Sequence, residues 1–458
     1  MQLIIKDRAF YKKVFLLALP IAMQSLITIG VNMLDTIMIG RLGEMKLSAT
    51  SLANQFITIY HIFCMGLGMG ASVLVSRYWG MRFNEKEKAN EALKTTVCIM
   101  IRLTVGLGLI FALLTLLIPD KIMRMYTSKE EIVSLGVVYF RYSVITYFFL
   151  GLSLVCTIVL RCVGQVRLPL LVSIGAFFVN LGANYVFIFG KCGMPRMEVA
   201  GAALGTLIAR VFEASIICGY LLFKDDRIGF RIKNLWMKTG NLLSEYIRIS
   251  IPVLISDGIL AIGNNSVAMV IGRLGVTFVA ANAITSVTQQ MSTVLIQGVS
   301  QAGAIVTGQT LGEGDKDKAN RQANAFLGLG IVLGLCSALF ILITSEPIIR
   351  SYGVSEETAD VARQLMDAIS LIIVFQAANS IMTKGVLRGG GDTKMLMLTD
   401  NVFLWVLSIP MGIVAGLVLH LPAFWIYTCL KFDQIAKAVW CVFRLRSKKW
   451  IKKISTGN

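Results

Sequence analysis

The sequence predicts an all-α integral membrane protein with twelve transmembrane helices in two six-helix bundles. Three observations lead to this fold class. Hydrophobic residues make up 56% of the 458 positions and charged residues only 15%, with a mean hydropathy of +0.72, which excludes an ordinary soluble enzyme. Twelve apolar stretches are long enough to cross a bilayer, and the chain repeats itself about halfway along its length. The net charge of +18 then indicates contact with an anionic membrane surface, and no nucleic-acid partner is expected.

The apolar stretches give the predicted helices. A bilayer core about 30 Å thick needs roughly 20 apolar residues per helix. The stretches that meet this length lie near 14–39, 51–76, 95–118, 134–160, 168–190, 199–223, 249–271, 277–308, 322–344, 364–387, 395–419 and 422–443. The first follows several basic residues, as in a signal peptide, but it is too long and has no small-residue cleavage site, so we interpret it as helix one. The last contains Lys431, Asp433 and Lys437 and is the least apolar.

The distribution of lysine and arginine predicts the orientation in the membrane. Basic residues concentrate in the N-terminal segment, in 224–248 and in 444–458, which lie on one side if the helices alternate in direction. By the positive-inside rule, both termini are expected in the cytoplasm, in a multi-pass protein of the cell inner (cytoplasmic) membrane. The basic segments 224–238 and 444–453 are expected to bind anionic lipid headgroups.

An internal repeat defines the predicted domains. The matches are Pro20 with Pro252, Asn32 with Asn264, Ile39–Gly43 with Ile271–Gly275, Gly66 with Gly298, Gly80 with Gly312 and, further on, Val159–Leu160–Arg161 with Val386–Leu387–Arg388. Each copy holds six spans, so both copies enter the membrane in the same direction, and a pseudo-two-fold axis along the membrane normal should relate them. The predicted domains are an N-terminal lobe (1–223), a basic linker (224–248), a C-terminal lobe (249–443) and a basic tail (444–458). Pro20 is a candidate hinge in helix one.

Asp35 is the most informative ionisable residue. It lies in the outer third of helix one, with no basic residue within one helical turn. An acid at membrane depth is costly and therefore points to function. Removal from water favours binding of a proton or a sodium ion to such a carboxylate. The alternative is a boundary carboxylate paired with Arg41.

Polar residues in helices five and six could complete a site around this acid. Asn180 and Asn184 are four residues apart and share one helix face. Thr206 lies in the segment Gly201–Thr206, where small residues allow close backbone approach. Their oxygens, next to one carboxylate, could bind a cation or a proton, although interhelical hydrogen bonds alone would also explain them.

The second half has its own candidate. Asp257 follows Pro252 in helix seven and has either a coupling role or a purely structural one. Arg210 and Glu213 are three residues apart and are expected to form a structural ion pair. Uncharged polar residues that could line a substrate cavity are Gln55, Gln289, Gln290, Gln297 and Gln376.

Absent motifs narrow the function further. The sequence contains no G-x-x-x-x-G-K-[ST] phosphate loop, no H-E-x-x-H and no G-x-S-x-G, so it predicts neither ATP hydrolysis nor an enzyme. The nine cysteines form no C-x-x-C pair, and two histidines, His61 and His420, do not make a metal site with them. No cofactor is expected beyond a coupling proton or sodium ion.

Taken in order, these segments resemble the multidrug and toxic-compound extrusion (MATE) transporters. The resemblance rests on the Pro20 helix running into Asn32-x-x-Asp35 and Gly40–Gly43, on the Asn180/Asn184 face, on Gly201–Thr206 and on Leu387–Thr393. It implies two six-helix lobes, alternating access, and a cation site at Asp35, Asn180, Asn184 and Thr206. Several members carry a second aspartate at the position of Asn184, and some carry an acid at the position of Ala377, so this chain departs from the pattern at both places.

The resemblance therefore implies a secondary active antiporter. It would export cationic or amphipathic small molecules in exchange for protons or sodium ions, with Asp257, Gln55, Gln297 and Gln376 as second-lobe coupling or substrate-binding candidates. A monomer is expected. The alternative is a lipid-linked oligosaccharide flippase of the same superfamily, which would need a basic cavity for pyrophosphate, whereas Arg102, Arg141 and Arg210 are the few basic candidates at depth.

Overall fold

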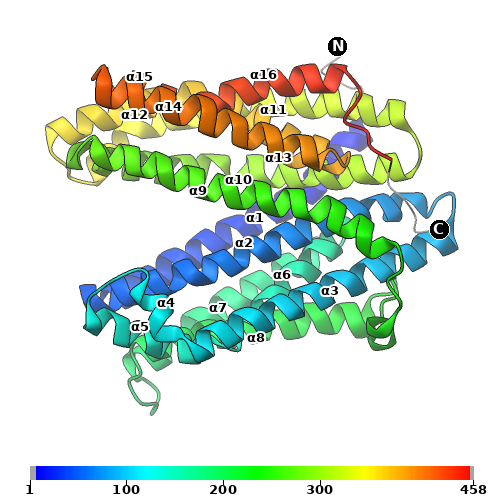
Figure 1. Ribbon diagram of the computed structural model, residues 1–458, viewed down its shortest axis with the longest axis horizontal. Coiled ribbons are helices and arrows are strands. Elements are labelled where there is room, and N and C mark those ends of the chain that lie inside the picture. The colour runs from blue at the N-terminus through cyan, green and yellow to red at the C-terminus, as the bar shows by residue number, and fades with distance from the viewer. Residues whose placement is uncertain (1–6, 454–458) are drawn as a thin grey trace. The chain divides into compact units, whose positions relative to one another are not determined.

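The computed structural model describes residues 7–453, which form helices and, within that range, no β-strand (Figure 1). Lys6 and the last five residues of the predicted tail lie outside the described residues. The α-helices are α1 (Arg8–Gly40), α2 (Glu44–Met81), α3 (Lys86–Leu117), α4 (Pro119–Arg124), α5 (Glu130–Ser143), α6 (Thr146–Cys162), α7 (Arg167–Phe189), α8 (Val199–Gly219), α9 (Leu242–Arg273), α10 (Val276–Gly312), α11 (Lys316–Ser351), α12 (Glu356–Ser380), α13 (Thr393–Val402), α14 (Ile409–Ile413), α15 (Ala423–Leu430) and α16 (Phe432–Arg446). Short π-helical or 3-10 segments are η1 (Tyr220–Lys224), η2 (Ile232–Trp236), η3 (Ile381–Leu387), η4 (Phe403–Ser408) and η5 (Val414–Val418).

All twelve predicted spans coincide with helices of this structure. Among the described residues, nine helices are long and apolar enough to cross a membrane, or ten if the bent pair α5 and α6 is one span. The remaining two predicted spans are α10, whose polar side chains lower its hydropathy, and the pair α15 and α16. The predicted spans therefore all fall on helices, including the two that do not pass this test of length and hydropathy.

Two spans differ from the single straight helices expected. The 134–160 span is bent by 58° between α5 and α6. The Ser143 hydroxyl donates to the carbonyl of Tyr139 at the end of α5, and such back-bonding disturbs a helix. The last span is interrupted at Lys431, between α15 and α16.

The chain divides into two compact units, each described here by itself. Among the described residues, the first comprises 7–22, 76–85 and 251–453, and the second comprises 23–75 and 86–250. In the first, α12 packs against α10, α11 and α16; in the second, α8 packs against α5, α6 and α7. These units share most of their residues with the lobes predicted from the repeat, and the lobes themselves stay a prediction.

Two of the three unit boundaries inside long apolar helices lie beside a proline, and the third crosses α2 between Val75 and Ser76. The boundary crosses α1 between Ala22 and Met23, just after Pro20, and crosses α9 between Ser250 and Ile251, just before Pro252. A proline inside a helix removes one backbone hydrogen bond and makes that turn easier to bend. The hinge role of Pro20 remains a prediction, and the boundary between the two units lies next to this residue.

The repeat is visible in one contact of the first unit. A Cβ atom on Gly80 of α2 would collide with the Gln309 carbonyl of α10, and one on Gly312 would collide with the Arg77 carbonyl. Gly312 and Gln309 are the repeat equivalents of Gly80 and Arg77, so the two helices use the same positions against each other. Only glycine allows this close approach of backbones.

Candidate functional site: a polar cavity around Asp35

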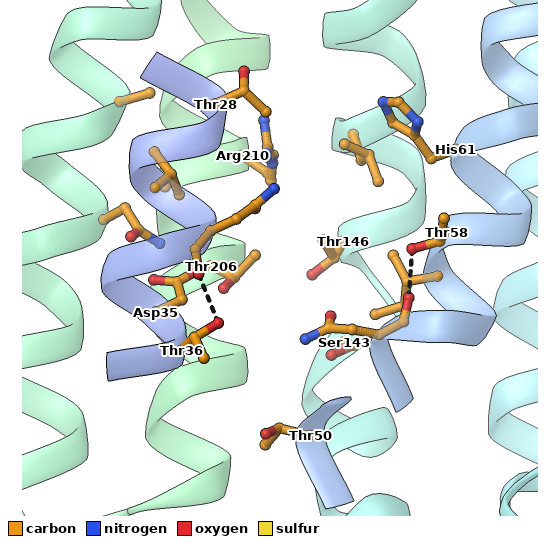
Figure 2. A pocket seen from close by; sticks show the side chains of 18 of the residues that line it. Thr28, Asp35, Thr36, Thr50, Thr58, His61, Ser143, Thr146, Thr206 and Arg210 are labelled. Carbon is orange, nitrogen blue, oxygen red and sulfur yellow. Dashed lines mark hydrogen bonds between the residues drawn. The ribbon is translucent and has the colours of Figure 1, made fainter. Parts of the chain in front are cut away.

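The second unit encloses a cavity of about 500 Å³ between α1, α2, α5, α6, α7 and α8. Figure 2 shows Asp35, Thr206 and Arg210 on one side of it, with Thr58, His61, Ser143 and Thr146 across from them. Most of these lining groups are hydroxyl, amide or charged side chains. Because every wall is a helix of this unit, the cavity is a property of this part of the chain alone.

The predicted residues of helices one, five and six meet in this cavity. Asp35, Asn180 and Thr206 line it, and the Asn184 amide donates to the Asp35 carboxylate at 2.6 Å. The same amide nitrogen donates to the Asn180 oxygen at 3.2 Å. Asn180 and Asn184 are 4% and 1% exposed, so the half-buried acid is held by one enclosed amide, which a second enclosed amide holds in turn. A hydrogen bond to a carboxylate is worth about 1.5–3 kcal/mol, more than a neutral one.

Small residues of α8 allow Asn184 to reach this position. A Cβ atom on Gly205 would collide with the Asn184 side-chain oxygen, and one on Gly201 would lie 2.5 Å from the Phe187 carbonyl. The helices α7 and α8 therefore pack with their backbones close together. The Asn184 oxygen is buried and has no hydrogen-bond partner among the described residues, which leaves one acceptor open beside Asp35.

The charges that line the cavity leave one negative charge in excess. Arg210 donates to Glu213 at 2.7 Å, so the predicted ion pair is confirmed, and it lies in the cavity wall. Arg210 also acts electrostatically on Asp35 and His61. With Asp35 ionised and His61 neutral, the lining carries two carboxylates and one guanidinium. A cation is therefore favoured, and protonation of Asp35 would remove the excess.

Three functional candidates in this cavity were not predicted from the sequence. The Tyr139 hydroxyl donates to the Asn54 oxygen at 3.1 Å and lies close to Asp35 and Arg210, and His61 forms part of the wall near Arg210. Asn54 could have been identified from the sequence, because it is a polar residue inside a predicted apolar span. The neighbouring Gln55 was chosen instead, and it is exposed and absent from the lining.

Of the second-lobe candidates, Asp257, Gln297 and Gln376 lie in the first unit and do not form one cluster, whereas Gln55 lies in the second unit. Asp257 pairs with Arg388 at 3.5 Å, and the guanidinium is 5% exposed. Gln376 accepts from Gln289 at 2.8 Å, whereas Gln297 is exposed. The coupling or binding roles proposed for Asp257, Gln297 and Gln376 stay predictions.

The repeat explains what Arg388 does. Its equivalent in the first copy, Arg161, donates to the Gln24 side-chain oxygen at 2.6 Å and 3.1 Å. Both copies thus use this arginine to hold the helix that carries the repeated proline. Arg161 bonds to Gln24 of α1, and Arg388 pairs with Asp257 of α9. Asp257 is therefore paired with an arginine, whereas Asp35 accepts from the neutral amide of Asn184.

Comparison with known proteins decides the family. The MatE family model matches residues 20–186 and 252–414, one segment in each copy of the repeat. The chain belongs to the MatE family. MatE proteins are membrane transporters, so this multi-pass chain is a transporter and not an enzyme, as predicted.

Individual relatives agree along almost the whole chain. A probable multidrug resistance protein NorM of Thermotoga maritima is 26% identical over 445 residues, covering 96% of this MatE chain and 93% of the relative. A solved multidrug resistance MATE family transporter in an outward-facing conformation has a TM-score of 0.84 at 20% identity, with 96% of each chain covered. A MOP superfamily transporter from Pyrococcus furiosus gives 0.83 at 20% identity, again with 96% of each chain covered. These likenesses confirm the predicted fold of twelve transmembrane helices in two six-helix bundles.

Proposed function

We propose that this transporter is a secondary active antiporter that exports cationic or amphipathic organic compounds in exchange for protons or sodium ions. Two findings support the substrate class. The relatives above include proteins described as multidrug resistance proteins, and the cavity joins polar groups to apolar walls such as Ile27, Val31 and Phe177. Broad selectivity fits a cavity with few fixed charges and much apolar surface.

The single observation that carries the mechanism is the Asp35–Asn184 contact in a cavity with one excess negative charge. With Asp35 ionised, the cavity attracts a cationic solute. When a proton or sodium ion binds Asp35, the excess charge disappears and the attraction with it. Solute and coupling ion therefore compete for one carboxylate, which is the requirement for exchange.

The amide of Asn184 fits both states of the acid. Its nitrogen donates to ionised Asp35, while its oxygen has no partner among the described residues. A half-turn of the amide would offer that oxygen to a protonated carboxyl or to sodium. Asn180 and Thr206 supply further oxygens, which suit sodium as a hard cation.

The conformational step is assigned to α1. Occupation of Asp35 would change the hydrogen bonds of α1 towards α7, and the Pro20 turn could absorb the resulting bend. Alternating access follows if the cavity opens to one side at a time. For a monocationic solute the one-for-one exchange moves no net charge, so the concentration gradient of the proton or sodium ion drives export; for a neutral solute, one charge moving inward across 100 mV supplies about 2.3 kcal/mol. We place the transporter in the inner membrane as a monomer, with both termini in the cytoplasm.

The flippase alternative gains no support from the cavity. Recognition of a pyrophosphate would need several basic groups, whereas Arg210 is the one lysine or arginine among the lining residues, and Glu213 neutralises it.

The test is transport by proteoliposomes. A fluorescent organic cation is followed under an imposed pH gradient and, separately, under a sodium gradient. The wild type should respond to one of the two, and Asp35→Asn should lose that response. Asp226→Asn is the matched control, because it removes a carboxylate that is 91% exposed in a loop. A gradient response in Asp35→Asn equal to the wild type would refute the coupling role.

A further inference from the structure

The basic linker after α8 carries groups that the proposed mechanism does not use. It lies within the second unit and packs on α3 through η2. Its Phe230 and Ile228 side chains are buried, and the Ile228 backbone nitrogen donates to the Asp225 carboxylate at 3.0 Å. The Arg227 guanidinium donates to the Val163 carbonyl, just after α6, at 3.1 Å. The linker is therefore held in a fixed position on the helices of this unit.

One face of α3 changes in character where its contact with the linker ends. In the first third of α3, Lys94 approaches Gly229 of the linker. One turn further, the Cys98 thiol donates to the Leu235 carbonyl at 3.3 Å, and one turn beyond that Arg102 donates to the same oxygen. After Arg102 this face carries exposed apolar side chains at intervals of three and four residues, namely Val105, Leu109, Leu113 and Leu116. An exposed apolar face of a transmembrane span contacts lipid chains, so the linker meets α3 at the boundary between headgroups and hydrocarbon.

Arg102 has hydrogen-bond donors that the protein does not use. The residue is exposed, and it is absent from the lining of the cavity around Asp35. Its Nε donates to the Leu235 carbonyl at 2.8 Å, and its Nη2 donates to the same oxygen. Among the described residues, Nη1 has no acceptor and the guanidinium has no carboxylate partner. A charge without a counter-ion beside hydrocarbon is costly, and a phosphate matches the fork of N–H donors of an arginine.

The linker adds further unpaired charge and an exposed indole next to this arginine. Lys233 and Lys238 lie on either side of the contact in the sequence, and both are exposed, without a carboxylate partner in the part of the chain that the structure describes. Arg231, by contrast, pairs with Asp226 at 2.9 Å. The segment 224–238 carries five basic and two acidic residues, so positive charge remains in excess when both acids are counted. Trp236 directly follows the contacting residue and is 76% exposed, and tryptophan is enriched at the headgroup level of membranes.

We infer that Arg102, Lys233, Lys238 and Trp236 form a binding site for an anionic phospholipid. The lipid phosphate accepts from Nη1 of Arg102 and is attracted by the two lysines, and the acyl chains follow the apolar face of α3 that begins at Val105. This face continues directly from the charged groups, which favours a membrane lipid over a free phosphate or a nucleic acid. The inference goes beyond the proposed function and does not depend on it.

The test uses lipids with brominated acyl chains, which quench a nearby indole. The full-length protein is reconstituted in bilayers that contain brominated phosphatidylglycerol or, separately, brominated phosphatidylcholine at the same mole fraction. Each protein is compared with its Trp236→Phe counterpart, so the difference reports Trp236 alone. The wild type should be quenched more strongly by the anionic lipid. Equal quenching by the two lipids would overturn the inference, and so would no quenching by either lipid.

Charge variants test the residues of the site. Lys233→Gln and Lys238→Gln break no hydrogen bond within the described chain, so the fold should be kept. Each should lower the preference for phosphatidylglycerol about fivefold, which corresponds to about 1 kcal/mol per basic residue near an anionic surface. Lys121→Gln is the matched control, because it removes an equal charge from an exposed position on α4, which follows the opposite end of α3. A preference in both linker variants equal to that of the control would overturn the assignment.

Arg102→Gln tests the guanidinium itself. It should lower the preference at least as much as either lysine variant, because it removes both the charge and the free Nη1 donors. Since it also breaks the bonds to the Leu235 carbonyl, Arg102→Lys is measured beside it and should restore part of the preference through its charge. A wild-type preference in Arg102→Gln would overturn the role of this residue.

Inorganic phosphate distinguishes a lipid site from a general anion site. At constant ionic strength, millimolar phosphate should leave the preference of the wild type unchanged, because a free phosphate has no acyl chains to bind along α3. Loss of the preference would overturn the assignment to a lipid. No transport is measured in these experiments, so a failure of the proposed function and a failure of this inference are separate results.

Discussion

The substitution Gly205→Ala tests whether close packing of α7 and α8 holds the Asn184 amide on Asp35. The new methyl group would collide with the Asn184 side-chain oxygen and would lie 3.1 Å from its amide carbon and backbone nitrogen. The side chain would have to rotate, and the 2.6 Å bond to Asp35 would break. Loss of a hydrogen bond to a charged group costs about 1.5–3 kcal/mol. An alanine normally stabilises a helix by roughly 0.5–1 kcal/mol relative to glycine, so the net loss should be about 0.5–2.5 kcal/mol.

The matched control is Gly219→Ala, on the same helix. Nothing lies within 4 Å of a Cβ atom at Gly219, so only the propensity gain of about 0.5–1 kcal/mol remains. Thermal unfolding of the purified proteins should therefore rank Gly219→Ala above the wild type and Gly205→Ala below it. In an Asp35→Asn background the penalty of Gly205→Ala should shrink, because the broken bond no longer involves a charge. Equal stability of the two alanine variants would refute the packing argument.

Three other predictions follow from the same structure. Trp450→Ala should destabilise the protein by about 3–5 kcal/mol, seen as a lower melting temperature, because this indole is 0% exposed; an unchanged melting temperature would contradict its burial. Glu213→Gln should weaken binding of a cationic dye about 15–20-fold and leave a neutral dye unaffected. One charge roughly 10 Å away contributes about 1.7 kcal/mol at an effective dielectric constant of about 20, and equal affinity would contradict the charge balance. The hydrogen bond and charge of Lys46 hold the pKa of Glu198 below its usual range. The wild type should therefore keep its stability above the usual glutamate pKa and lose part of it on further acidification, and Glu198→Gln should lack this dependence.

Hydropathy and the repeat were sufficient to predict the fold. Each span needs only a run of apolar residues, which a sequence displays directly, and the duplicated Pro20 and Pro252 mark equivalent helices. The bend after Ser143 and the break at Lys431 were not predicted, because neither of them changes the apolar content by which the spans were located.

The candidate site was predicted in part. The spacing of Asn180 and Asn184, together with the family resemblance, predicted that helices five and six contribute to a site at Asp35. The structure places these side chains together. Apolar content fixes membrane depth but not which face of a helix points inward. Asn54, which lines the cavity, was therefore missed, and Gln55, which does not line it, was chosen.

The role of the C-terminal segment also needed tertiary structure. The sequence predicted that 444–453 binds lipid headgroups. In the structure Arg444 pairs with Asp392 at 2.7 Å, and Trp450 packs on Gly390. Arg446, Lys448, Lys449 and Lys453 are exposed and remain candidates for lipid contact, so the prediction stays open for those residues.

The central claim is that solute and coupling ion compete for Asp35. The most direct measurement is ion release when a fluorescent organic cation is added to the purified protein in weakly buffered solution, with protons followed by a pH indicator and sodium by an ion-selective electrode. The account predicts that the wild type releases one of these ions in proportion to bound dye, and that Asp35→Asn releases none. Release by Asp35→Asn equal to that of the wild type would contradict it.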